Sequence, residues 1–256
     1  MIQVLAGQDI LSRTRPCSYA STHPLSWDRL RQIPGFAAAC KDALPTDPTA
    51  AYWFARVRDK LSAYISEPSY ALRRMRKGSS NSARTARAMA FQKDSKTQKT
   101  LAEFDVLLSH LPKDAYAHEL RGQILLESGG FGVAVGSYQS AALFAPKEPL
   151  IQARHGQSLL AAGQPKVAFD VLEKARARDP VNLRLMRSLG LAYAQTGQDD
   201  QAALATAKRY VMRGRLKDAA FHAQRAFDQL PRGSIGSRSA LDILDAAKRQ
   251  SKQRKP

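Results

Sequence analysis

The chain has 256 residues, a length that fits one or two domains with a buried core. Lys and Arg number 40 against 22 Asp and Glu, so the formal net charge is +18 and anionic partners are favoured. We find no apolar run of membrane-spanning length, no CxxC cysteine pair and no signal-peptide pattern at the N-terminus.

Residues 1–80 are predicted to form a short helical region ahead of the rest of the chain. We expect residues 1–11 to end a helix and residues 12–25 to form a loop. Ser26 is a suitable N-cap for a short helix. A longer helix is predicted to begin at Pro48, because proline fits the first turn of a helix.

The same residue types recur with a 34-residue period beyond a Gly- and Ser-containing segment, 77–84, which is the predicted hinge. The recurring positions are Gly122, Gly156 and Gly190, then Ala134, Ala168 and Ala202, and finally Pro112, Pro146 and Pro180. This pattern resembles the tetratricopeptide repeat (TPR), a pair of antiparallel helices. The resemblance implies an all-α helical-hairpin solenoid, preceded here by a short helical N-terminal remnant.

The repeat array is assigned to residues 81–237. Its first three repeats are predicted at 81–114, 115–148 and 149–182, and a fourth begins at residue 183. In each repeat the small residues let two helices approach closely, and the proline stops the second helix. One repeat cannot bury its apolar face alone, so neighbouring repeats must stack.

The repeat pattern then shifts by half of one unit. The shifted positions are Ala207, Tyr210, Ala219, Ala226 and Pro231. We therefore expect helix 199–213 to be the second helix of one pair and the first of the next. Helix 216–229 would close the array, and residues 238–256 would form a capping helix, near 238–250, with a basic tail.

Four sequence segments, taken in order, resemble one particular family. They are LAGQDILS, ASTHPLSWDRL, HELRGQILLESG and LATAKRYVMRGRLKDAAFHAQRA. The family is that of the BepA-type periplasmic zinc metallopeptidases of Gram-negative bacteria, which have an HExxH motif and a C-terminal TPR domain. The resemblance implies a periplasmic protein that contacts outer-membrane proteins and their assembly machinery during quality control.

The zinc site of that family has no counterpart in this sequence. A zinc hydrolase needs two histidines four positions apart on a helix, and none of the five histidines is so placed. We therefore predict no catalytic residue, no metal ligand and no cofactor in this chain. By resemblance, His23 lies in a loop near the active site of complete family members, although a simple turn-forming role fits it as well.

A concave peptide-binding groove is expected on the first helices of the repeats, whose polar side chains suit an extended peptide. The candidate groove residues are Tyr116, Glu119, Gln123, Gln157, Arg184 and Arg187. An ordinary polar surface is the alternative interpretation of these positions.

Three functional hypotheses follow from the sequence. The first is the non-catalytic, protein- or peptide-binding TPR region of a BepA-type protease. The second is a piece of an active zinc endopeptidase whose N-terminal domain precedes this sequence. The third is a basic TPR scaffold that binds anionic partners in the cytoplasm, in keeping with the missing export signal. Nucleic acid is not the expected partner, because the basic residues accompany no aromatic RNA-binding motif and no helix-turn-helix.

Overall fold

The computed structural model describes residues 31–36, 38 and 47–253. The chain divides into two compact units between Ala55 and Arg56. Every element in the described ranges is a helix, which confirms the all-α class. The predictions for residues 1–30, including those for His23 and Ser26, lie outside the described residues.

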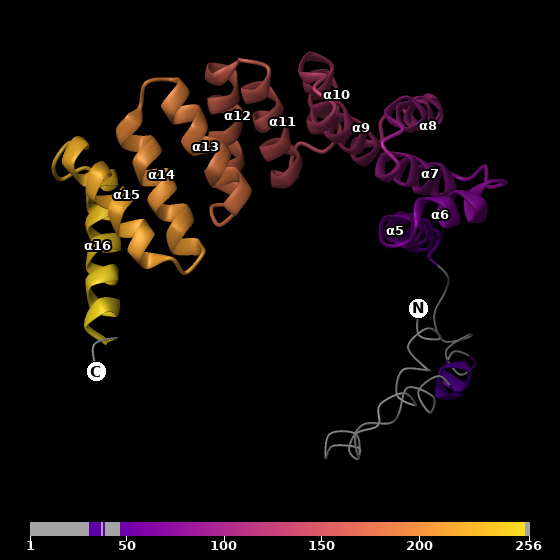
Figure 1. The fold of residues 1–256 in the computed structure, drawn as a ribbon, viewed down its shortest axis with the longest axis horizontal. Helices are drawn as coiled ribbons and strands as arrows, with labels where there is room; N and C mark the ends of the chain where they lie inside the picture. Colours follow the sequence, from indigo (N-terminus) through magenta and orange to yellow (C-terminus); the bar gives the residue numbers. More distant parts are fainter. Residues whose placement is uncertain (1–30, 37, 39–46, 254–256) are drawn as a thin grey trace. The chain divides into compact units, whose positions relative to one another are not determined.

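The helices of the second unit follow one another as successive hairpins (Figure 1). Each helix from α6 to α16 packs against its neighbour in the chain. In order, the labelled helices are α5 (Pro48–Ile65), α6 (Pro68–Met75), α7 (Asn81–Lys93), α8 (Thr97–His110), α9 (Ala115–Glu127), α10 (Phe131–Phe144), α11 (Pro149–Ala161), α12 (Pro165–Arg178), α13 (Leu183–Gln195), α14 (Asp199–Met212), α15 (Leu216–Gln229) and α16 (Ile235–Gln253).

The first helix of each hairpin, α7, α9, α11 and α13, ends in the same turn. In this turn one residue has a positive φ angle. The backbone N–H of the residue after it donates to the carbonyl five residues before the donor, at 2.8–2.9 Å, as in a Schellman motif. The positive-φ residues follow the 34-residue period, at Ser95, Gly129, Gly163 and Gly197. Ser95, with φ of 54°, adopts a left-handed conformation that glycine adopts without steric cost.

The predicted half-repeat shift is confirmed at α14. Gly214, half a repeat after the last of these turns, has φ of 70°, and the Arg215 N–H donates to the Tyr210 carbonyl at 3.0 Å. Helix α14 therefore ends as a first helix does. The next helix, α15, ends with Leu230 N–H donating to the Ala226 carbonyl, which is how α8, α10 and α12 end. Helix α14 packs against α13, α15 and α16, so it is shared by two hairpins.

The last helix begins earlier than the sequence predicts. Helix α16 starts at Ile235 rather than near residue 238, because the Ser234 hydroxyl accepts the Ser237 N–H at 3.1 Å and caps the helix. Its buried face, with Ala240 and Ile243, joins a core cluster with residues of α14 and α15. This helix therefore covers the apolar face that the last hairpin would otherwise expose.

The turn between α6 and α7 lies at the predicted hinge. Arg87 of α7 forms hydrogen bonds with this turn and with α8. The Arg87 guanidinium donates to the carbonyls of Met75 and Gly78 at 3.0 and 2.5 Å, and to both carboxylate oxygens of Glu103 at 2.6 and 2.9 Å. Bidentate, charge-assisted hydrogen bonds of this kind are among the stronger ones in proteins. They hold the connection from α6 in place against α7 and α8.

The glycines of the 34-residue pattern bring the two helices of each pair into contact. A Cβ added at Gly156 would overlap the side chain of Leu172, which is fully buried on α12. At the equivalent position in the next pair, a Cβ on Gly190 would lie 3.5 Å from the Thr206 hydroxyl, an ordinary contact. The smaller Thr206 thus leaves more room between α13 and α14 than Leu172 leaves between α11 and α12.

These contacts predict opposite effects for one substitution at two equivalent glycines. Gly156→Ala should destabilise the fold by about 1–3 kcal/mol, because the buried Leu172 has no free space to move into. Gly190→Ala should be neutral or stabilise by up to about 1 kcal/mol, because alanine favours the helix. Urea unfolding followed by circular dichroism measures both changes, and equal midpoints for the two variants would contradict the packing described here.

Candidate functional site

A groove with a volume of about 1130 Å³ crosses the second unit and is lined by residues of α9, α11, α13, α14 and α15. No residue of α10 or α12 lines it. The first helices of the hairpins therefore form the groove, and α14 joins them. Its participation follows from the half-repeat shift, which gives α14 the role of a first helix.

The first helices that line the groove begin at equivalent positions of the repeat. The Asp114 carboxylate accepts the N–H groups of Tyr116 and Ala117 at 3.1 and 3.0 Å at the start of α9. Asn182 makes the same two contacts at the start of α13, and Pro149 occupies the first position of α11. These signals fix where α9, α11 and α13 begin.

Four of the six predicted groove residues come together in the structure. Gln123, Gln157, Arg184 and Arg187 all line the groove, from three successive first helices. Gln123 and Gln157 occupy equivalent positions, and Leu191 has the same position in the next repeat. Equivalent residues on neighbouring helices thus form a row across the groove, as the repeat requires.

The other two predicted residues, Tyr116 and Glu119, do not line the groove. Both lie in the first half of α9, where the Tyr116 side chain is exposed and Glu119 is half-buried. Burial raises the pKa of Glu119, while the positive charges of Lys60 and Arg154 act in the opposite direction. Glu119 therefore lies near Arg154 and contributes negative charge beside that end of the groove.

Five arginines line the groove, and the sequence-based prediction includes only two of them. They are Arg154, Arg184, Arg187, Arg209 and Arg225. None forms an ion pair with another described residue. The acidic residues that line the groove are Glu127 and Asp199. Because the cations outnumber the anions, the groove has a positive potential.

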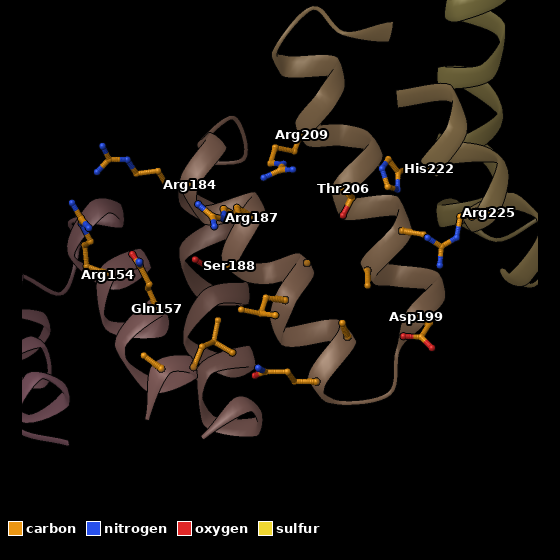
Figure 2. A pocket seen from close by; sticks show the side chains of 18 of the residues that line it. Arg154, Gln157, Arg184, Arg187, Ser188, Asp199, Thr206, Arg209, His222 and Arg225 are labelled. Atoms are coloured by element: carbon orange, nitrogen blue, oxygen red, sulfur yellow. The ribbon is translucent and has the colours of Figure 1, made fainter. Parts of the chain in front are cut away.

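Four of these arginines form what we call the arginine row. In Figure 2, the row runs across α11, α13 and α14 in the order Arg154, Arg184, Arg187 and Arg209. Asp199 lies at the opposite end of α14 from Arg209, and Arg225 lies on the same side of the view as Asp199. The groove therefore has a cationic edge and a second edge of mixed charge.

An aromatic stack supports the α14 end of the arginine row. The Arg209 guanidinium carbon lies 5.2 Å from the Tyr210 ring centre, and this ring stacks on His222 of α15 at 5.4 Å. Burial lowers the pKa of His222, and the positive charges of Arg225 and Arg209 lower it further, against a smaller opposing effect of Asp218. His222 therefore reports the positive potential at this end of the groove.

Sequence reasoning missed three of the arginines for identifiable reasons. In the 34-residue register, Arg154 lies one residue after the position that the sequence-based prediction assigned to the groove on the neighbouring first helices. Arg209 and Arg225 lie on helices that the regular repeat places away from the groove or beyond its end. The half-repeat shift was visible in the sequence and was the signal that could have placed Arg209 on the groove.

The described residues offer no metal site and no membrane span. They contain no group of three or more His, Cys, Asp or Glu side chains placed to hold a metal ion. Within the same residues, no helix has both the length and the apolar character needed to cross a membrane. His23, the predicted neighbour of a zinc site in complete family members, lies outside the part of the chain that the structure describes.

Comparisons with known proteins identify the repeat. Residues 154–226 match the family model of the tetratricopeptide repeat. Solved structures of MamA proteins share the fold: that from Desulfovibrio magneticus RS-1 is 17% identical, with a TM-score of 0.55 over 63% of this chain and 94% of its own. MamA of MSR-1 is 16% identical, with a TM-score of 0.53 over 65% of this chain and 98% of its own. No curated protein sequence matched.

The second unit of this chain contains a TPR domain, as the 34-residue pattern predicts. TPR domains are scaffolds for protein–protein interaction, in which helix pairs present an extended concave surface. In the described part of this chain, the groove is lined by residues of α9, α11, α13, α14 and α15.

The charges around His222 predict how its pKa responds to substitution. Arg225→Gln should raise the pKa of His222 towards the ordinary value of 6.5 without reaching it, because burial, the largest cause, remains. The pKa of His155, which burial alone lowers, should not change. NMR titration of the imidazole protons measures both pKa values. An unchanged pKa of His222 in the variant would contradict an electrostatic effect of Arg225 on this histidine.

The lowered pKa of His222 also makes the free energy of unfolding depend on pH. Because the folded chain holds the pKa of His222 below the unfolded value, the unfolded chain binds more protons below about pH 6.5. The stabilisation from the neutral imidazole is therefore complete above that pH and is lost as the pH falls through the folded-state pKa. Urea midpoints of the parent chain and of His222→Gln, compared across this range, measure the loss. The difference between the two urea midpoints should change with pH. A difference that stays constant would contradict the lowered pKa of His222.

Proposed function

We propose that this TPR domain binds a segment of another protein in the groove formed by α9, α11, α13, α14 and α15. The groove lined by polar side chains of successive helices, with Gln123 and Gln157 at equivalent positions, is the observation that carries the proposal. Gln157 can donate to and accept from the backbone of an extended peptide. The Gln123 amide donates to the Glu127 carboxylate at 2.8 Å and keeps its oxygen as an acceptor. The groove residues belong to helices, so little backbone entropy is lost there on binding.

A photo-cross-linking amino acid placed in the groove tests this proposal in cells. Ala194 of α13 lines the groove and is exposed, whereas Ala177 of α12 is exposed and lies outside it. Benzoylphenylalanine at position 194 should yield cross-linked protein adducts that are absent when it stands at position 177. The proposal fails if the two positions give the same adducts, or if position 194 gives none while the protein remains folded.

We further propose that the chain corresponds to the C-terminal part of a BepA-type metallopeptidase and acts in outer-membrane protein quality control. The four sequence segments, found in family order, support this proposal. In that role the groove would hold substrate proteins or components of the assembly machinery in the periplasm. Catalysis would depend on a zinc-binding domain encoded upstream.

The DNA upstream of this chain tests that assignment. We expect one of the three forward frames to encode an HExxH motif followed by a downstream glutamate and preceded by a signal peptide. An uninterrupted frame would indicate a complete protease, and a frame broken by stop codons would indicate a remnant. If HExxH is absent from all three frames, the BepA assignment is wrong, although the peptide-binding proposal is unaffected.

A further inference from the structure

We infer that the groove is specific for an acidic segment of its protein partner, which binds in an extended conformation with its carboxylates on the arginine row. This inference rests on the proposed peptide-binding function and names the chemical class of the peptide. It follows from three features of the groove: guanidinium groups without ion pairs on one edge, amide side chains in the lining, and a floor of small residues.

The arginine row brings like charges together without an anion between them. Arg187 of α13 and Arg209 of α14 come from antiparallel neighbours and line the same part of the groove (Figure 2). The Arg154 Nε atom is buried and has no hydrogen-bond partner in the part of the chain described. A carboxylate bound among guanidinium groups that line one groove gains charge-assisted hydrogen bonds and favourable Coulomb energy.

The floor of the groove leaves space for a peptide backbone. Gly190, Ala194, Ala202 and Thr206 line it at the junction of α13 and α14, where the glycine faces a threonine instead of a large side chain. The distance from α9 to α14 is three helix-to-helix steps of about 8–10 Å each. An extended peptide of roughly eight residues covers that distance at about 3.3 Å per residue.

The lining of the groove favours a peptide over nucleic acid. Single-stranded nucleic acid is held by aromatic side chains on which its bases stack, and His222 is the only aromatic side chain in the lining described here. By contrast, Gln123, Gln157 and Gln195 present amide groups that match peptide backbone groups. A second copy of this chain is a poor ligand because it also carries a net charge of +18.

Fluorescence anisotropy with two labelled peptides of roughly ten residues tests the inference. In the acidic peptide, Asp and Glu alternate with Ala and Ser. In the reference peptide, Asn and Gln replace Asp and Glu, so that only the charge differs. We expect the full chain to bind the acidic peptide at least about ten-fold more tightly, with affinity falling as salt is added.

Matched double variants locate the site. Arg187→Gln with Arg209→Gln should weaken binding of the acidic peptide by about ten-fold or more. The control, Arg232→Gln with Arg238→Gln, removes the same charge from exposed positions outside the groove and should change the affinity less than about two-fold. A second groove variant, Arg184→Gln with Arg187→Gln, alters exposed side chains of α13 alone and guards against misfolding caused by the loss of Arg209.

A charge-swapped variant separates charge complementarity between groove and peptide from non-specific attraction of the peptide to the basic chain. Arg187→Glu with Arg209→Glu should lose the acidic peptide and gain affinity for a peptide in which Lys alternates with Ala and Ser. Circular dichroism and the urea midpoint verify that each variant is folded. If the groove and control variants weaken binding equally, the affinity comes from the overall charge of the chain and the inference is wrong.

The remaining outcomes distinguish this inference from the function on which it rests. Equal binding of the acidic and amide peptides would overturn the preference for acidic ligands and leave peptide binding in place. If the cross-linker at position 194 gives adducts but the chain binds neither peptide, the preference for acidic ligands is wrong and protein binding in the groove still stands. An oligothymidylate that displaces the acidic peptide and binds more tightly to the groove would assign the arginine row to nucleic acid instead. Loss of the cross-links as well would reject both proposals.

Discussion

The structure depends on close contact between paired helices, which is tightest in the α9–α10 and α11–α12 pairs. Gly122 faces the ring of the buried Tyr138, and Gly156 faces Leu172, at distances that leave no space for a Cβ. A large side chain on the second helix thus fills the space that glycine leaves on the first. Turns with a left-handed residue then reverse the chain at the same point in each pair, so neighbouring pairs stack in register.

The departure from this regularity at α14 creates the distinctive part of the groove. Thr206 takes the place of the large residue, and α14 ends in the turn that belongs to a first helix. As a result α14 pairs with both α13 and α15, and its side chains line a surface that α10 and α12 do not reach. A shift of half a repeat in the sequence therefore changes which helices are available for binding.

Positive charge is concentrated in this groove. Several arginines outside it have acidic partners: Arg87 binds Glu103, and Arg121 binds Asp105. In the groove, five arginines lie together without ion pairs among the described residues, and their field contributes to the lowered pKa of His222. This excess of positive charge is the basis of the inferred preference for an acidic peptide.

The sequence by itself determined the period, the helical class and the half-repeat shift. Proline restricts the local backbone, and glycine adopts the left-handed turn conformation that other residues disfavour. It also predicted helix 199–213 to within one residue of the observed α14 (Asp199–Met212) and brought Gln123, Gln157, Arg184 and Arg187 to one surface. Only the tertiary structure decided that Arg154 and Arg225 join them and that Tyr116 and Glu119 do not. The membership of a groove depends on how far each helix rotates and how closely it approaches its neighbours, and those quantities are set by packed side chains distant in sequence, such as Leu172 and Thr206.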